Sequence, residues 1–108
     1  MTRIGRLAMM VREVAGLTTS YWMKSPDGRV ALHVCARVGS LREGDRTAKR
    51  MKRRAAEIAE AMGFEDAPSG SLVRGDGKGT VTAEGVTEMP WSPRVEKELS
   101  RLGLAEVK

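Results

Sequence analysis

Residues Ser25–Val38 read SPDGRVALHVCARV, and this stretch decides the predicted fold. Within SPDG, Pro26 suits the first central position of a β-turn and Gly28 suits its left-handed exit. The residues that follow alternate between an apolar face and a mixed face, which is typical of a strand with one side on a core. The apolar face carries Val30, Leu32, Val34, Ala36 and Val38, and the mixed face carries Ala31, His33, Cys35 and Arg37. Because LTTSYWMK at residues 17–24 is rich in β-branched and aromatic residues, we predict a β-hairpin over residues 17–38.

A second decisive stretch, DRTAKRMKRRAAEIAEAM at Asp45–Met62, has the spacing of an amphipathic helix. Its apolar stripe comprises Ala48, Met51, Ala55, Ile58, Ala59 and Met62. Gly63 is a suitable C-terminal stop. Two helix starts stay open, because Ser40 with Glu43 forms a candidate capping box and Asp45 is a candidate N-cap in its own right.

The predicted helix 45–62 has an unusual charge distribution. Six of the nine residues from Arg46 to Arg54 are Lys or Arg. They are Arg46, Lys49, Arg50 and Arg53 opposite the apolar stripe, with Lys52 and Arg54 on its flanks. In a helix that begins at Asp45 these bases lie near the N-terminus, where the helix dipole disfavours positive charge, and they repel one another at i,i+4 spacing. Stability does not explain the cluster, so we predict an anionic partner, contacted also by nearby Arg29, Arg37 and Arg42.

The rest of the chain supplies three further elements. SLVRGDGKGTVTAEGV at residues 71–86 predicts a second hairpin, and its GDGKGT tip lacks the glycine that a Walker motif needs at position 72. PWSPRVEKELSRLG at residues 90–103 predicts a short helix with Ser92 as its cap. Its inward residues would be Val95, Leu99 and Leu102. Residues 1–15 fit either an amphipathic helix or a buried strand, and both interpretations stay open.

Length and composition predict one domain over residues 1–108. We expect an α+β fold in which a small antiparallel sheet of two hairpins, with a preceding strand if residues 4–15 form one, packs against the basic helix. The net charge is +5, and residues 1–54 carry 13 Lys or Arg against 4 Asp or Glu. Such polarisation indicates an anionic partner. The longest apolar run, LAMMV, is too short to span a membrane, so we expect a cytoplasmic protein with no membrane partner.

The reactive residue types give little support for an enzyme. Cys35 is the only cysteine and lies near His33 on one strand face, but the sequence offers no third group that would orient the histidine. No paired carboxylates or metal-ligand spacings occur. We therefore predict a non-enzymatic protein without cofactor, metal or small-molecule substrate. Tyr21 and Trp22 point to opposite faces of their strand, so one belongs to the core and the other is a candidate for stacking on a base or filling an interface. Because the chain has a single Phe elsewhere, we expect both in the core.

RIGRLAM at residues 3–9, SYWMKSPDG at residues 20–28 and the basic helix together resemble small phage- and prophage-encoded proteins that open with an IGRLAM-type strand. This resemblance covers residues 3–62. It implies a strand over residues 6–14 and a mobile-element origin, and it implies no catalytic motif.

Three functions follow as hypotheses. The first is nucleic-acid binding through the Arg/Lys face of the helix. The second is a phage-encoded inhibitor or accessory protein of the anti-defence type that binds an acidic surface of a host protein. The third is a virion or assembly component, for which a homo-oligomer would be expected.

Overall fold

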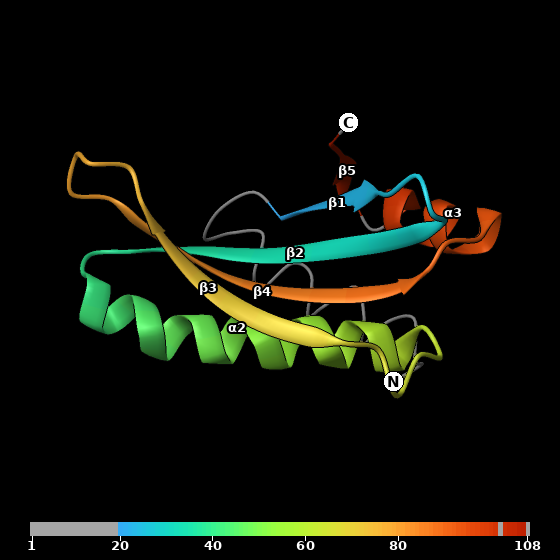
Figure 1. Ribbon diagram of the computed structural model, residues 1–108, viewed down its shortest axis with the longest axis horizontal. Helices are drawn as coiled ribbons and strands as arrows, with labels where there is room; N and C mark the ends of the chain where they lie inside the picture. The colour runs from blue at the N-terminus through green and yellow to red at the C-terminus, as the bar shows by residue number, and fades with distance from the viewer. Residues whose placement is uncertain (1–19, 102, 108) are drawn as a thin grey trace.

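The computed structural model describes residues 20–101 and 103–107, and they form an α+β fold, as predicted (Figure 1). In chain order the described elements are β1 (Tyr21–Lys24), β2 (Arg29–Val38), α2 (Leu41–Ala61), β3 (Ser69–Gly75), β4 (Val81–Pro90), α3 (Pro93–Arg101) and β5 (Ala105–Glu106). Residues 1–19 lie outside the described part of the chain. The strand and helix interpretations of residues 1–15 therefore both stay predictions.

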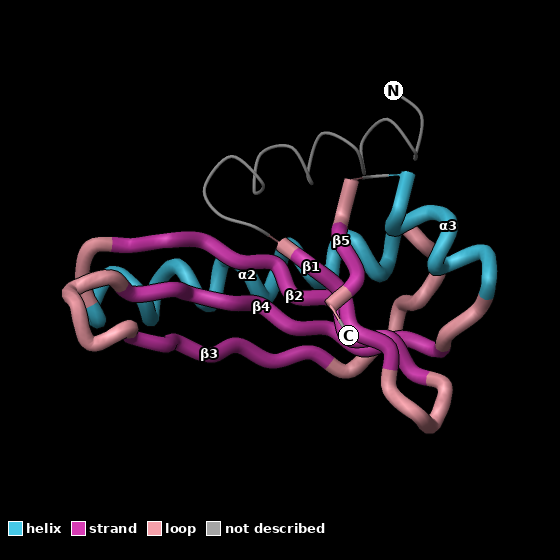
Figure 2. Tube along the Cα trace, turned by 90° about the horizontal axis from the view of Figure 1, so that it is seen from above, coloured by secondary structure: helices cyan, strands magenta, loops and turns pink. Residues whose placement is uncertain are grey.

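The sheet has the strand order β3-β4-β2-β1-β5. The long strands β2 and β4 pair antiparallel at its centre, with Val30 opposite Met89 and Ala36 opposite Ala83. β1 and β3 add antiparallel neighbours on either side, whereas β5 joins β1 in parallel. Figure 2 shows α2 running along the strands on one side of the sheet and α3 at one end. The two-residue strand β5 was not predicted from the sequence, because nothing in its local pattern distinguishes it.

The first hairpin forms as predicted. Gly28 has a φ of 83°, and its N–H donates to the Ser25 carbonyl at 3.1 Å. The Ser25 N–H donates to the Arg29 carbonyl at 2.8 Å, and its hydroxyl donates to the Asp27 carboxylate. These hydrogen bonds close the turn that the SPDG segment forms. The alternation that follows is confirmed in β2, where Val30, Leu32, Val34 and Ala36 are buried.

The second hairpin also forms, and the GDGKGT segment is its tip. The Asp76 carboxylate accepts hydrogen bonds from the backbone N–H groups of Lys78 at 2.7 Å and Thr80 at 3.1 Å. These bonds hold the pKa of Asp76 below its ordinary value, and the bond from Lys78 has the largest effect. Gly77 and Gly79 adopt φ values of 74° and 90°, which only glycine adopts readily. The glycines and the aspartate therefore serve the turn.

Helix α2 begins at Leu41, five residues before the start that an N-cap at Asp45 would give, so Asp45 is not the N-cap. Ser40 is the N-cap, and its hydroxyl oxygen accepts from the Glu43 N–H at 3.2 Å. The Glu43 carboxylate in turn accepts from the Gly39 N–H at 3.3 Å. Two otherwise unsatisfied donors are thereby bonded, which is why the earlier start prevails. Gly63, with a φ of 100°, follows the helix end as predicted.

The apolar stripe of α2 lies on the sheet, and its predicted members are all buried. The extra turn adds two buried residues, Gly44 and Thr47. Gly85 of β4 lies directly beneath the helix. A Cβ added there would lie 2.0–2.1 Å from backbone atoms of Met51 and Lys52. The helix backbone therefore rests on the backbone of β4, at a distance that only glycine permits.

Helix α3 has the predicted cap, because the Val95 N–H donates to the Ser92 hydroxyl oxygen at 3.2 Å. Val95 and Leu99 are buried, as predicted, whereas the side chain of Leu102 lies outside the described residues. The chain then turns at Gly103 and brings Leu104 to the core. In the described part of the chain, no helix has the length and apolarity needed to cross a membrane.

Candidate nucleic-acid interface

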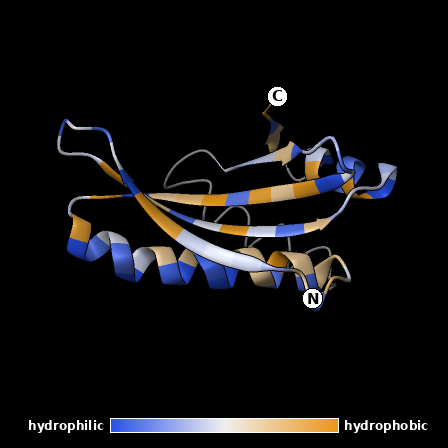
Figure 3. Ribbon diagram, viewed as in Figure 1, coloured by the Kyte–Doolittle hydropathy of each residue, from blue (hydrophilic) through white to orange (hydrophobic). Residues whose placement is uncertain are grey.

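The basic face of α2, defined here as Arg42, Arg46, Lys49, Arg50, Lys52 and Arg53, is fully exposed. At 100° per residue, four of its six side chains fall within a sector of about 60° opposite the buried stripe. These four are Arg42, Arg46, Lys49 and Arg53. Figure 3 shows the contrast between the hydrophilic surface of α2 and the hydrophobic residues of β2. Because the buried stripe faces the sheet, the charged side chains of the basic face point away from the sheet.

No other described residue neutralises the charges of the basic face. Among residues 20–101 and 103–107, none of its six side chains forms an ion pair. From Arg42 to Arg53 the face extends about 16 Å along the helix at 1.5 Å per residue. Arg54, which was also predicted to contact the partner, is half-buried, and its guanidinium contacts the Glu57 carboxylate at 3.3 Å.

The true helix start changes the interpretation of these charges. The dipole acts mainly within the first and last turns, and the first turn contains the favourable Glu43. Arg46 is already the sixth residue of the helix. The inference that the bases oppose the N-terminal dipole is therefore wrong. What persists is like-charge repulsion at i,i+4 spacing, as between Arg46 and Arg50.

A hollow of about 250 Å³ lies on one flank of the basic face. Arg50, Arg53 and Arg54 line it together with Glu57. The spacing of these residues at i, i+3, i+4 and i+7 places them around one patch of helix surface. Because Arg54 already contacts Glu57, the guanidinium groups of Arg50 and Arg53 are the ones here that suit an anionic oxygen cluster such as a phosphate.

Two residues predicted to lie near this face are elsewhere. Arg29 and Arg37 belong to β2, on the side turned away from α2, and Arg29 contacts Glu88 at 3.4 Å. They therefore do not lie beside the basic face, and their contact with the partner stays a prediction. The alternation of β2 places every second residue on the outer side of the sheet, whereas its valines point at α2.

Tyr21 and Trp22 point to opposite faces, as predicted. Trp22 is 1% exposed, and its indole N–H donates to the Leu104 carbonyl at 3.3 Å, so it belongs to the core. A stacking or interface role for Trp22 is therefore wrong. The Tyr21 ring stacks on the His33 imidazole with centroids 4.5 Å apart. This contact occupies one face of the ring on the side of the sheet away from α2.

The same outer side holds a buried polar cluster around Glu84, which is 1% exposed. Its Oε1 accepts hydrogen bonds from the Tyr21 hydroxyl and the Cys35 thiol, both at 3.3 Å. His33 Nδ1 lies 3.4 Å from Oε1 without forming a hydrogen bond. Arg74 contacts Oε2 at 2.5 Å and balances the carboxylate charge. One acid thus organises four side chains from three strands.

Glu84 is a residue that sequence reasoning missed, because nothing in the sequence indicated that an acid lies beside His33 and Cys35. The β2–β4 register places Cys35 opposite Glu84. The cluster does not activate the thiol. Burial, the hydrogen bond to Glu84 and the Glu84 charge together raise the pKa of Cys35 to about 12, although the Arg74 charge acts in the opposite direction. Because the thiolate is the nucleophile, this thiol is poorly reactive near neutral pH.

We expect Cys35→Ser to retain partner binding and to cost at most about 1–2 kcal/mol of stability, since a hydroxyl can still donate to Glu84.

The raised pKa of Cys35 also predicts that the stability of the protein depends on pH. The folded protein holds the thiol proton where the unfolded chain releases it. The stability that this group contributes is complete below the ordinary thiol pKa of 9.0 and is lost as the pH rises towards about 12. Denaturant titrations of both proteins at about pH 8 and about pH 11 should show a smaller alkaline loss for the variant, and equal losses would contradict this role.

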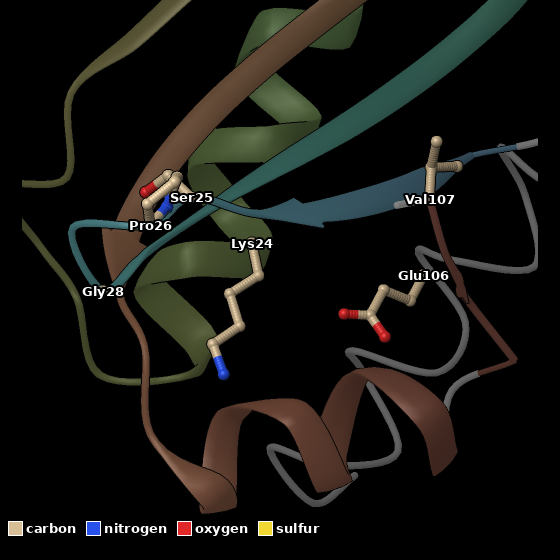
Figure 4. A pocket seen from close by; sticks show the side chains of 6 residues that line it. All are labelled: Lys24, Ser25, Pro26, Gly28, Glu106 and Val107. Carbon is tan, nitrogen blue, oxygen red and sulfur yellow. The ribbon is translucent and has the colours of Figure 1, made fainter.

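A separate opening of about 460 Å³ lies between the β1–β2 turn, β5 and α3 (Figure 4). Lys24 and Glu106 extend into it from β1 and β5, and turn residues complete its wall. The Lys24 ammonium already lies 3.7 Å from the centre of the Trp91 ring. We therefore assign this opening to the packing of the C-terminal segment.

Within the described ranges, no group of three or more His, Cys, Asp or Glu side chains is arranged to hold a metal ion. Comparison with protein-family models, with curated proteins and with solved structures gives no match for this chain.

Proposed function

We propose that this protein binds nucleic acid, without chemistry of its own, through the basic face of α2. The observation that carries the proposal is the row of six exposed bases with no ion pair among the described residues. Each like-charge neighbour on a helix costs about 0.2–0.5 kcal/mol. A polyanion would relieve this repulsion and would release condensed counterions as phosphates are neutralised.

Double-stranded nucleic acid fits this face better than a single strand. Proteins that bind single strands combine basic grooves with aromatic side chains on which bases stack. Helix α2 contains no aromatic residue, and from Arg42 to Arg53 the sector opposite the buried stripe carries only Arg and Lys. Such side chains contact phosphates of either strand, and Arg50 and Arg53 at the hollow suit a single phosphate group.

We expect duplexes of unrelated sequence to bind with dissociation constants within about threefold of one another at low salt, because phosphate contacts carry no sequence information. Fluorescence anisotropy with labelled DNA and RNA duplexes of about 20 base pairs, and with matched single strands, measures this. Absence of duplex binding at low salt, or a strong preference for one sequence, would overturn the proposal.

The same basic face also suits an acidic patch on a protein, as a phage-encoded inhibitor of a host protein would require. A pull-down after nuclease treatment separates the two. If nuclease treatment removes everything that co-purifies with the protein, the result supports our proposal. Stoichiometric recovery of one acidic protein that binds the basic face would favour the inhibitor.

A further inference from the structure

Strand β3 forms one border of the sheet. Its seven residues pair with β4 on one side, from Ser69 opposite Thr87 to Gly75 opposite Val81. No other described strand lies on its second side. The N–H and C=O groups on this second side form a template for another strand.

The hydrogen bonds at both ends of the hairpin show which backbone groups face outward. The Asp76 N–H donates to the Thr80 carbonyl at 3.1 Å, and the Glu88 N–H donates to the Pro68 carbonyl at 2.9 Å. Bonded pairs alternate along an antiparallel ladder, so the even-numbered residues of β3 bond to β4. The residues that direct their backbone groups to the open edge are then Ser69, Ser71, Val73 and Gly75.

The usual devices that block an edge strand are missing from β3. Its sequence, SGSLVRG, contains neither proline nor lysine, and the register with β4 runs without a bulge. The one charged residue, Arg74, is held at Glu84 on its own sheet. Leu72 at the centre of the strand is 39% exposed. Within the described part of the chain, the edge is therefore open and mildly apolar.

The edge is also complementary to itself. A second β3, related by a two-fold axis beside Leu72 and perpendicular to the sheet, runs antiparallel to the first. Ser69 then lies opposite Gly75, and Ser71 lies opposite Val73, so every outward backbone group finds a partner. Leu72 meets Leu72 of the second copy. Arg74 meets only Gly70, so the pairing brings no like charges face to face.

We propose that a second copy of this chain occupies the β3 edge and that the protein is a dimer with a continuous sheet across the two-fold axis. Self-pairing buries the exposed Leu72 against itself and satisfies the edge, which favours a second copy over an unrelated peptide. This inference does not depend on the proposed function.

The dimer places both α2 helices on the same side of the joined sheet, because the axis is perpendicular to the sheet. Helix α2 lies over β4. With strands about 4.8 Å apart, the two helices would be separated by about 14 Å, which exceeds the 8–10 Å of packed helices and leaves no clash. Both basic faces then point in one direction and double the surface open to an anionic partner.

Light scattering of the nucleic-acid-free protein should give a mass of about 24 kDa, twice the 11.8 kDa of the chain. Ser71→Pro removes an outward N–H and no bond to β4, so it should give a folded monomer. Ser71→Ala keeps the N–H and should remain dimeric. A wild-type mass near 12 kDa at about 100 µM, or an unchanged dimer for a folded Ser71→Pro variant, would overturn the proposal.

A second test reports the register itself. Opposed residues in a pair without hydrogen bonds have Cα atoms about 4.5 Å apart, within disulfide range. Leu72→Cys should therefore cross-link to its own copy on mild oxidation. Ser71→Cys is the control, since its two copies would be about 8 Å apart and beyond that range. Equal cross-linking of the two variants, or none at position 72, would contradict the two-fold axis beside Leu72.

Discussion

Gly85→Ala is expected to destabilise the protein by about 3 kcal/mol or more, which is a large share of the 5–15 kcal/mol typical of a domain. The new methyl group would lie 2.0–2.1 Å from the backbone of α2 at Met51 and Lys52. Backbone cannot rotate aside as a side chain can, so the whole helix must lift from β4. Thermal and denaturant unfolding, followed by circular dichroism, measure the loss.

Gly70→Ala is the matched control. Gly70 lies on the neighbouring strand β3, and a Cβ added there meets no atom within 4 Å. We expect its stability to change by less than about 0.5 kcal/mol. If Gly85→Ala and Gly70→Ala lose the same stability, the loss comes from replacing any glycine in a strand and not from the close contact with α2. If Gly85→Ala is as stable as the wild type, the close approach of α2 to β4 is wrong.

The largest functional effect is expected from the double variant Arg46→Glu, Lys49→Glu. Both side chains lie in the central sector of the basic face and make no ion pair among the described residues. Reversing them removes about two phosphate contacts and introduces repulsion, which should weaken duplex binding roughly 10- to 100-fold at low salt. Anisotropy titrations of the variant and the wild type on the same duplex measure the change.

The same double variant should be as stable as the wild type, or more stable by up to about 1 kcal/mol. A carboxylate at positions 46 and 49 would stand four residues before Arg50 and Arg53, in the favourable order. The control is Lys97→Glu, Arg101→Glu on α3, which changes the net charge equally at exposed positions. Equal weakening by the two double variants would show that net charge, and not the face of α2, drives binding.

Much of this fold could be predicted because its elements have local signals. SPDG and the alternation of Arg29–Val38 predict the first hairpin, and the spacing from Ala48 to Met62 predicts the buried side of α2. The start of α2 was open between two caps. The paired bonds of Ser40 and Glu43 decide between them in the structure.

The contacts that could not be predicted from the sequence depend on the pairing of strands that are far apart in the chain. Glu84 and Cys35 are far apart in the chain, and only the β2–β4 register brings them together. The only local signal for Glu84 was an acidic residue on the second hairpin. No local pattern predicts which strand pairs with the strand that carries it. The misplacement of Arg37 was avoidable, since its alternation with Val38 already placed it on the side away from the core.

The salt dependence of duplex binding tests the central claim most directly. If the basic face of α2 contacts about four phosphates, the logarithm of the association constant should fall against the logarithm of salt concentration with a slope of roughly −3 to −4. The double variant Arg46→Glu, Lys49→Glu should reduce the slope to roughly −2, while the α3 control keeps it. A wild-type slope near zero would contradict the account.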